Sequence, residues 1–392
     1  MRVIRSLAER EQGESATQFY RTGIKRYLPF ERNSCIQKRT RKFPSRCWYA
    51  EVSKSMARKK AGTVTIRDVA KRAGVSPITA SRALRDAPSV RLETRDLVKQ
   101  VAAELNYIPN FAAGMLSSQV SRMIGVIVPN LANSIFATTL QEISEGVRDG
   151  NYQLLVACNN YSIEREEELV RTFMSRGADA IVLTGHLHTA ETREILSRAS
   201  VPIIEMWSVS EKPIGISIGI DDRSAALTAA RHLIAGGRSR IGYIGGTTEG
   251  NDRAQARLDG FREAMKEAGF PERPELEIFG PFEFDTGASA IATLRRNAPD
   301  IDSVFAASDI IATGVLLQCL QDGINVPGEI AICGFDDARI VQMMRPSLTT
   351  ISFSRREIGR RVAEVLLQQL SGQTSDVKTV RIEHRLVIRQ TS

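Results

Sequence analysis

The chain has 392 residues, 42% of them hydrophobic, which is enough for two or three packed cores, and no apolar stretch is long enough to cross a bilayer. Its five cysteines include no CxxC pair, which excludes a disulfide framework or a zinc ribbon and is typical of a reducing cytosol. The net charge of +8 is uneven: residues 1–62 carry 16 Lys and Arg against 5 Asp and Glu, and residues 123–392 carry 28 against 35, which indicates that the basic front meets a polyanion.

The first 62 residues show neither helical nor strand periodicity, and their basic clusters favour a solvated or disordered segment. They contain no apolar core of a secretory signal, and their early glutamates argue against a mitochondrial transit peptide. Met56 stands just ahead of the first patterned element, so we expect residues 1–55 to be a mis-assigned extension of a chain that starts there. The alternative is a basic arm that adds non-specific affinity for nucleic acid.

Three short helices are predicted next, with a tight turn between the first two. Thr65 and Asp68 form a capping-box pattern at the start of the first helix, and Gly74 suits the turn that ends it. Ser76 and Pro77 suit the N-cap and first position of the second helix. A longer third helix follows, marked by apolar residues at helical spacing. This layout is typical of a helix-turn-helix DNA reader, and the basic excess favours that interpretation over a plain helical bundle.

The sequences TIRDVAKRAGVSPITASRAL (65–84) and ELNYIPN (104–110) resemble the headpiece of the lactose/galactose-repressor family, and the similarity covers nearly the whole chain from residue 63. The resemblance implies a DNA-binding domain at 63–108 with double-stranded operator DNA as its partner. It also implies that Pro77, Ile78 and Arg82 contact base edges. Arg82 is the best candidate among them for a bidentate guanine contact. Phosphate contacts, which orient but do not specify, are implied for Thr65, Ser76, Thr79, Ser81 and Tyr107.

Residues 109–120 look like a linker that is helical only when it is held. Asn110 can cap a short helix, but Gly114 costs about 1 kcal/mol relative to alanine, and so short a helix is marginal in water. In the family this segment is the hinge helix, which orders on operator binding. The resemblance implies that Asn110, Ala113 and Leu116 meet the DNA there, with Leu116 as a wedge in the minor groove.

From residue 121 to the C-terminus, short apolar runs alternate with amphipathic helices, which predicts parallel sheets covered by helices on both faces. The length suggests two such units. The resemblance implies a two-lobed core like a type I periplasmic binding protein, which binds an effector and forms a homodimer. We place lobe 1 at about 122–220 and 350–376, and lobe 2 at about 221–349 and 377–392.

The ligand site is expected at the carboxyl ends of the strands, where such folds bind ligands. Arg257, Ser308 and Asp336 match family pocket positions. The full set of expected ligand-binding residues is Asn130, Phe136, Trp207, Arg253, Arg257, Ser308 and Asp336.

Two patterns invite other interpretations. Gly215–Gly219 matches the nucleophile elbow of a hydrolase around Ser217, but its isoleucines alternate as in an ordinary strand. His186 and His188 could bind a metal, but no third His or Cys lies nearby, which favours a loop pair. We therefore expect no catalytic residue, no metal and no cofactor.

Within the family, residues 181–189, 201–206 and 217–221 look most like the gluconate-operon repressors. We therefore expect a cytoplasmic repressor that a sugar acid such as gluconate releases from DNA. Arg257 would bind the carboxylate in a bidentate manner, with Arg253 nearby, while Asp336 would face hydroxyls. The alternatives are a neutral sugar or a purine-type co-repressor as effector, a periplasmic sugar-binding protein, and a hydrolase using Ser217.

Overall fold

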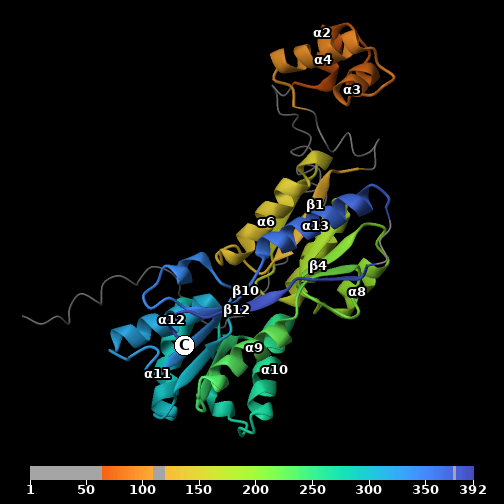
Figure 1. The fold of residues 1–392 in the computed structure, drawn as a ribbon. Coiled ribbons are helices and arrows are strands. Elements are labelled where there is room, and N and C mark those ends of the chain that lie inside the picture. The colour runs from red at the N-terminus through yellow and green to blue at the C-terminus, as the bar shows by residue number, and fades with distance from the viewer. Residues whose placement is uncertain (1–63, 109–119, 374–376) are drawn as a thin grey trace, which may run out of the picture. The chain divides into compact units, whose positions relative to one another are not determined.

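The computed structural model describes residues 64–108, 120–373 and 377–392, and the chain divides into two units, Met1–Pro109 and Asn110–Ser392. The expected extension at 1–62 and almost all of the hinge at 109–120 lie outside the described residues. The described residues of the first unit, 64–108, form three helices around a small apolar core (Figure 1): α2 (Ile66–Ala73), α3 (Pro77–Leu84) and α4 (Leu92–Glu104). No helix of the described residues is long and apolar enough to span a membrane.

The predicted helix ends are confirmed in the first unit. The Thr65 amide donates to Oδ2 of Asp68 at 2.8 Å, which closes one half of the capping box at the start of α2. Gly74 ends α2 in the left-handed conformation (φ 68°), where a side chain is disfavoured. The Ser76 hydroxyl then accepts from the Thr79 amide at 3.1 Å and caps α3.

Lobe 1 of the second unit is built on a parallel six-stranded sheet with the order β11-β5-β4-β3-β1-β2. Its strands are β1 (Met123–Val128), β2 (Gln153–Cys158), β3 (Ala180–Thr184), β4 (Ile203–Ser208), β5 (Ile216–Ile220) and β11 (Thr379–Arg381). Its helices are α6 (Ile135–Gly146), α7 (Ile163–Ser175), α8 (Ala190–Ser197) and α13 (Arg355–Leu370), with a short 3-10 turn η1 (Arg148–Gly150). In this lobe α6 packs against α13 (Figure 1), and α7 packs against α8.

Lobe 2 is built on a second six-stranded sheet with the order β12-β10-β9-β8-β6-β7, parallel except for the antiparallel β10–β12 pair. Its strands are β6 (Ile241–Gly246), β7 (Glu277–Gly280), β8 (Ser303–Ala306), β9 (Ala331–Phe335), β10 (Thr349–Phe353) and β12 (His384–Val387). Its helices are α9 (Asp222–Ala235), α10 (Asp252–Glu267), α11 (Phe284–Asn297) and α12 (Asp309–Gln321), with 3-10 turns η2 (Pro274–Leu276) and η3 (Arg339–Gln342).

The lobe boundaries differ from the expected ones at the C-terminal end. Strand β10, expected in lobe 1, pairs with β9 in lobe 2, and β11, expected in lobe 2, pairs with β5 in lobe 1. The chain therefore passes between the lobes after β5, after β10 and again between β11 and β12. Strand–helix alternation does not reveal these crossings, because a strand of three to five residues carries no sign of which sheet edge it joins.

Close packing of α9 against α10 prepares the site. Gly260 on α10 makes this approach possible, because a side-chain carbon there would lie 2.2 Å from the Arg223 carbonyl oxygen on α9. The contact brings Arg257 of α10 beside Asp222 in the first turn of α9. Both helices start at the carboxyl ends of strands, so their first turns face the space between the lobes.

Candidate functional site

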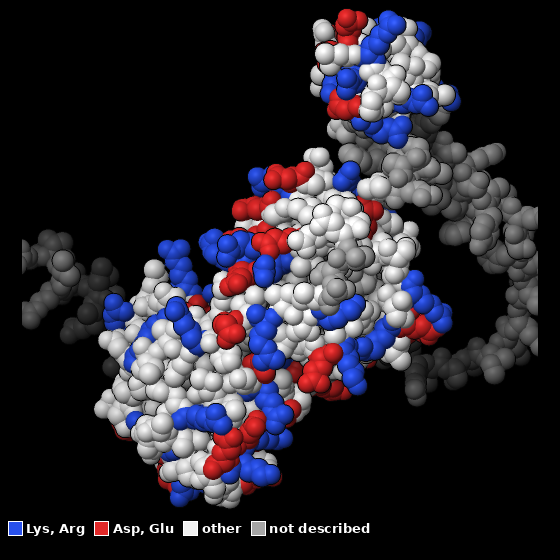
Figure 2. All heavy atoms as spheres, turned by 45° about the vertical axis from the view of Figure 1, so that its right-hand side comes forward, with Lys and Arg blue, Asp and Glu red and all other residues white. Residues whose placement is uncertain are grey.

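The second helix of the first unit exposes the side chains expected to reach base edges. Pro77, Ile78 and Arg82 of α3 are exposed, and Ile78 keeps 67% of its surface. The exposed Ile78 side chain is available for an apolar contact with another molecule. Figure 2 shows several Lys and Arg side chains on the visible face of this unit. The surface therefore combines positive charge with an apolar contact point.

Two of the expected phosphate-contacting hydroxyls already take part in helix capping. The Thr65 hydroxyl donates to Asp68 at 2.7 Å, and the Ser76 hydroxyl accepts from the Thr79 amide. Ser81 accepts a hydrogen bond from Arg85 at 3.1 Å, and Tyr107 is half-buried against the small core. The hydroxyls of Thr65, Ser76 and Ser81 therefore retain only part of their hydrogen-bonding capacity for a phosphate. Asn110, Ala113 and Leu116 lie outside the described residues.

Six of the seven expected ligand-binding residues line one small cavity between the lobes. Lobe 1 contributes Phe136 and Trp207, and lobe 2 contributes two arginines, a serine and an aspartate: Arg253, Arg257, Ser308 and Asp336. The cavity has a volume of about 20 Å³, close to the space that one water molecule needs. The two lobes are therefore closed over this inner cavity, and a larger ligand requires them to separate or the side chains to move.

Arg257 is less free than the sequence suggests. Its Nε donates to Oδ1 of Asp222 at 2.7 Å, and its Nη1 donates to the Ala307 carbonyl at 2.8 Å, while the guanidinium stacks 3.8 Å from the centre of the Phe335 ring. The Nε edge of Arg257, which could have bound a ligand carboxylate in a bidentate manner, is therefore already used by the carboxylate of Asp222. Only the remaining Nη protons of Arg257 are available to a ligand.

Arg253 is the freer of the two cations. Its buried Nε has no hydrogen-bond partner among the described residues, and its nearest carboxylate oxygen, Oδ1 of Asp252, lies 3.8 Å away. The guanidinium lies 6.0 Å from the centre of the Phe136 ring of lobe 1. A carboxylate brought into the cavity would meet here a positive charge that is not yet neutralised at hydrogen-bonding distance.

Two more buried polar atoms of the cavity lack a partner within the described part of the chain: Nε1 of Trp207 and Oδ1 of Asp336. The indole N–H is a donor only, whereas the carboxylate oxygen is an acceptor when ionised. Burial raises the pKa of Asp336, and the positive charges of Arg257 and Arg355 oppose this shift. Because unsatisfied buried polar atoms cost free energy, the cavity is prepared for a ligand that offers both acceptors and donors.

Backbone strain is concentrated at the same place. Trp207 and Asp336 have positive φ angles of 83° and 113°, a region that residues other than glycine rarely adopt. Such strain clusters at ligand sites, where the surrounding structure holds it. Trp207 is the last residue but one of β4 and Asp336 follows the end of β9, and both side chains line the inner cavity.

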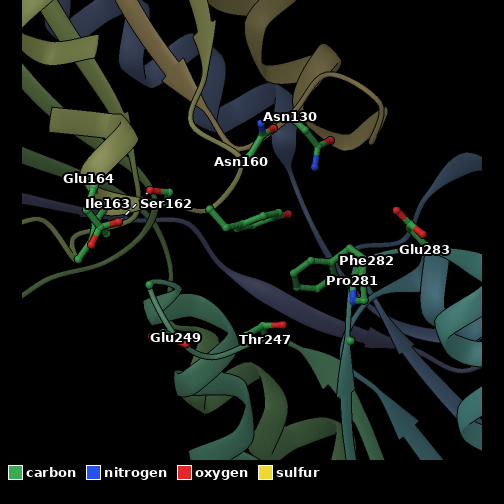
Figure 3. Close-up of a pocket in the computed structure, with 13 residues that line it drawn as sticks. Asn130, Asn160, Ser162, Ile163, Glu164, Thr247, Glu249, Pro281, Phe282 and Glu283 are labelled. Atoms are coloured by element: carbon green, nitrogen blue, oxygen red, sulfur yellow. Dashed lines mark hydrogen bonds between the residues drawn. The ribbon is translucent and has the colours of Figure 1, made fainter. Parts of the chain in front are cut away.

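A wider outer groove of about 570 Å³ adjoins the inner cavity (Figure 3). Asn130, the seventh expected residue, lines this groove and not the inner cavity, and its Oδ1 accepts from the Asn133 amide at 2.9 Å. Tyr161 of lobe 1 and Phe282 of lobe 2 line both spaces, with ring centres 5.4 Å apart. This aromatic pair therefore stands between the inner cavity and the outer groove.

Six lining residues of the inner cavity were absent from the expected set: Asn133, Ile135, Tyr161, Asn251, Ala254 and Phe282. Tyr161 follows β2 and Asn251 caps α10, so the strand-end rule could have found both. Phe282 follows β7, a short strand that lies at the edge of its sheet and is only partly buried. Its sequence carries no pattern that separates it from a surface loop.

The two patterns with an enzymatic interpretation occupy structural positions. Ser217 lies inside β5, where its hydroxyl donates to the Ser208 carbonyl at 3.0 Å and accepts from the Ser210 amide at 2.9 Å. A nucleophile elbow needs a strand-to-helix turn, and this serine has none. His188 is buried between two glutamates, and His186 faces lobe 2.

Two family models match the chain: "Bacterial regulatory proteins, lacI family" at residues 65–110 and a periplasmic binding protein-like domain at residues 230–392. Among curated proteins, the HTH-type transcriptional regulator GntR of Pseudomonas aeruginosa is 35% identical and covers 84% of this chain and 96% of its own. The HTH-type transcriptional regulator IdnR of Escherichia coli is 32% identical over 82% of this chain and 97% of its own.

Solved structures agree with these matches. A LacI-family transcriptional regulator from Silicibacter pomeroyi has a TM-score of 0.78 and 30% identity, covering 84% of this chain and 99% of its own. A structure of the lac repressor dimer bound to operator and the anti-inducer ONPF has a TM-score of 0.73 and 25% identity, with the same coverage. The similarity therefore extends over the DNA-binding unit and both lobes.

Proposed function

The chain belongs to the lacI family of bacterial regulatory proteins, which are DNA-binding regulators and not enzymes, and from that premise we propose that it is a repressor released from its operator by a sugar acid such as gluconate. The effector binds between the lobes and changes the balance between a DNA-binding and a released state. The protein acts in the cytoplasm, where its operator lies.

The observation that carries the sugar-acid proposal is the set of unpartnered polar atoms in the inner cavity. Nε of Arg253 and Nε1 of Trp207 need acceptors, which a carboxylate supplies, and Oδ1 of Asp336 needs a donor, which a hydroxyl supplies. Phe136 packs against Trp207 with ring centres 4.8 Å apart and offers an apolar surface for a carbon chain. An aldonic acid carries all three features on one short molecule.

We further propose that the protein works as a homodimer joined in part through lobe 2. Five large apolar side chains are exposed on α11, α12 and η3 and the turn after it, each to between 44% and 62%: Phe284, Leu317, Leu320, Ile340 and Met343. Apolar residues gathered on neighbouring elements favour an interface. A second copy brings a second DNA-binding unit, which a pseudo-palindromic operator requires.

Calorimetric titration tests the effector proposal. Gluconate should bind the wild-type protein, and glucose, which matches it in size but lacks the carboxylate, should bind much more weakly. Arg253→Ala should lower gluconate affinity by about 1.5–3 kcal/mol, the usual contribution of a charge-assisted hydrogen bond. Equal binding of the two sugars, or an Arg253→Ala protein with unchanged gluconate affinity, would exclude the sugar acid and leave the repressor assignment intact.

A further inference from the structure

One contact joins the two lobes beside the inner cavity. His186, in the loop between β3 and α8 of lobe 1, donates its backbone N–H to Oδ2 of Asp252 at 2.5 Å, and its ring Nδ1 lies 2.9 Å from the same oxygen. Asp252 is the first residue of α10 in lobe 2, and its side chain is only 11% exposed. A single carboxylate oxygen of one lobe therefore accepts a backbone hydrogen bond from the other lobe. It also lies beside the ring nitrogen of the same residue as an ion-pair contact, without hydrogen-bond geometry.

The other oxygen of the same carboxylate is directed to the cation of the cavity. Oδ1 of Asp252 accepts the backbone N–H of Arg253 at 2.9 Å and lies 3.8 Å from its Nε. Asp252 thus holds the start of α10, on which Arg253 stands, at a fixed distance from the loop of lobe 1. A shift of Asp252 would move the guanidinium that faces the cavity.

The loop of lobe 1 is shaped for this contact. Gly185 has a φ of 87°, and a side-chain carbon there would lie 2.6 Å from Oδ1 of Asp252, so only glycine leaves room for the carboxylate. Arg193 of α8 donates to the His186 carbonyl at 2.8 Å. Two residues further on, His188 anchors the loop in the interior of lobe 1 through Glu166. The loop is therefore fixed to its own lobe at His186 and again at His188.

We propose that His186 and Asp252 form an interlobe latch, in which His186 is a positioning residue that closes the lobes over the inner cavity and fixes Arg253 for the effector. The effect on the effector rests on the proposed function, whereas the closure of the lobes does not. The latch uses no atom that binds the ligand, so it acts on affinity through position alone.

The latch should respond to pH. Its contact with Asp252 raises the pKa of His186, against the opposing effect of burial. The other charged or titratable groups near it are Glu205, His188 and Arg193, whose guanidinium donates to the His186 carbonyl. Opening the lobes removes Asp252, so protonated His186 favours closure. This stabilisation is complete below the ordinary histidine pKa of 6.5 and is lost as the pH rises through the raised value. Effector affinity should therefore fall as the solution becomes more alkaline.

Hydrogen exchange of the full-length protein tests the latch without any effector. His186→Ala should speed amide exchange in the peptides that cover 184–188 and 250–257, because the ring contact with Asp252 is lost and only the backbone N–H at position 186 then joins the loop to α10. His186→Gln, which keeps a side-chain donor, should restore much of the protection. Leu187→Ala, in the same exposed loop, is the matched control and should exchange like the wild type. Wild-type exchange in His186→Ala would overturn the latch.

Gluconate titration from pH 6 to pH 9 tests the positioning of Arg253. His186→Ala should weaken binding at least about fivefold at pH 6 and flatten the pH dependence, and His186→Gln should recover affinity but not the pH dependence. A double-mutant cycle with Asp252→Asn should be non-additive. Additive effects, or an unchanged pH profile in His186→Ala, would overturn the positioning role. If the wild type does not bind gluconate, the effector proposal fails, and the exchange measurement alone decides the latch.

Discussion

Arg257 and Asp222 form an ion pair inside lobe 2, with Nε donating to Oδ1 at 2.7 Å and side chains that are 7% and 0% exposed. Burial raises the pKa of Asp222, and the charge of Arg257 opposes this shift. The pair joins α10 to α9 at the edge of the inner cavity. Arg257 therefore supports the fold of the lobe as well as lining the inner cavity, so a loss of binding in its variants has to be compared with their loss of stability.

Arg257→Ala should destabilise the core, because it leaves Asp222 as a buried carboxylate without its partner. Breaking a buried pair in this way costs about 3–5 kcal/mol of unfolding free energy, to be measured by urea unfolding. Arg223→Ala is the matched control, since it removes an arginine from an exposed pair with Glu263 on the same two helices. Equal losses in the two variants would contradict the role given to Arg257.

Trp207→Phe should weaken gluconate binding without unfolding the protein. The phenyl ring keeps the packing against Phe136 but lacks the N–H that has no partner in the cavity, so a loss of about 0.5–1.5 kcal/mol in binding is expected by calorimetry. Tyr243→Phe is the control, because it removes another unpartnered buried polar atom that does not line the cavity. Its gluconate affinity should equal that of the wild type, and a Trp207→Phe protein with wild-type affinity would exclude the indole as a donor.

The strand-end rule predicted much of the inner cavity because the fold itself brings strand ends together. Ser308 and Asp336 follow β8 and β9, which are neighbours in one sheet, so their proximity needs no detail beyond the order of strands. The ion-pair partner of each cavity side chain was harder to predict. The Arg257–Asp222 pair joins residues 35 positions apart through the packing of two helices, and no spacing in the sequence encodes it.

The latch and the lobe boundaries likewise could not be predicted from the local sequence. His186 was visible in the sequence as one half of a histidine pair, but its partner Asp252 lies 66 residues away in the other lobe. Strands β10 and β11 were assigned to the wrong lobes because three crossings with short connections look like ordinary loops. The local pattern of apolar and polar residues predicts helices and strands. Contacts between the lobes depend instead on how the two lobes pack against each other.

Arg82→Ala should lower operator affinity by about 1–3 kcal/mol and relax the sequence preference at one base pair, because Arg82 is exposed on α3 and is expected from the family resemblance to contact a guanine edge. Binding would be measured at fixed salt on the operator and on a set of single-base variants. Lys99→Ala serves as the charge-matched control, since Lys99 lies on α4 and pairs with Asp86 at 2.5 Å. An Arg82→Ala protein that binds all sites uniformly more weakly would indicate a phosphate contact instead.

Leu116→Ala tests the hinge expected from the sequence, which lies outside the described residues. A leucine wedge acts only on DNA, so operator affinity should fall while gluconate affinity stays unchanged. Fluorescence anisotropy with labelled operator and calorimetry with gluconate measure the two affinities on the same preparation. Unchanged operator affinity at matched salt would exclude the wedge.

His188 predicts a pH dependence of stability. Its ring lies between Glu166, 2.5 Å from Nδ1, and Glu205, 3.2 Å from Nε2, and all three side chains are buried. Burial lowers the pKa of His188, but the hydrogen bonds and charges of the two glutamates outweigh it and raise the pKa to about 9. The folded pKa lies above the unfolded value of 6.5, so the stabilisation is complete below pH 6.5 and is lost as the pH rises towards 9.

Urea unfolding at steps between pH 6 and pH 9 measures this loss as the difference between the wild type and His188→Gln. The glutamine keeps polar contacts to Glu166 and Glu205 but does not titrate, so the fall in unfolding free energy across this range should shrink in the variant. His232 contributes to the pH dependence of stability with the opposite sign to His188. Burial lowers the pKa of His232, so folding favours its neutral form. Removing His232 should leave the fall at least as steep as in the wild type. If His188→Gln and the wild type lose stability in parallel from pH 6.5 to pH 9, the buried histidine is neutral throughout and the charged triad is excluded.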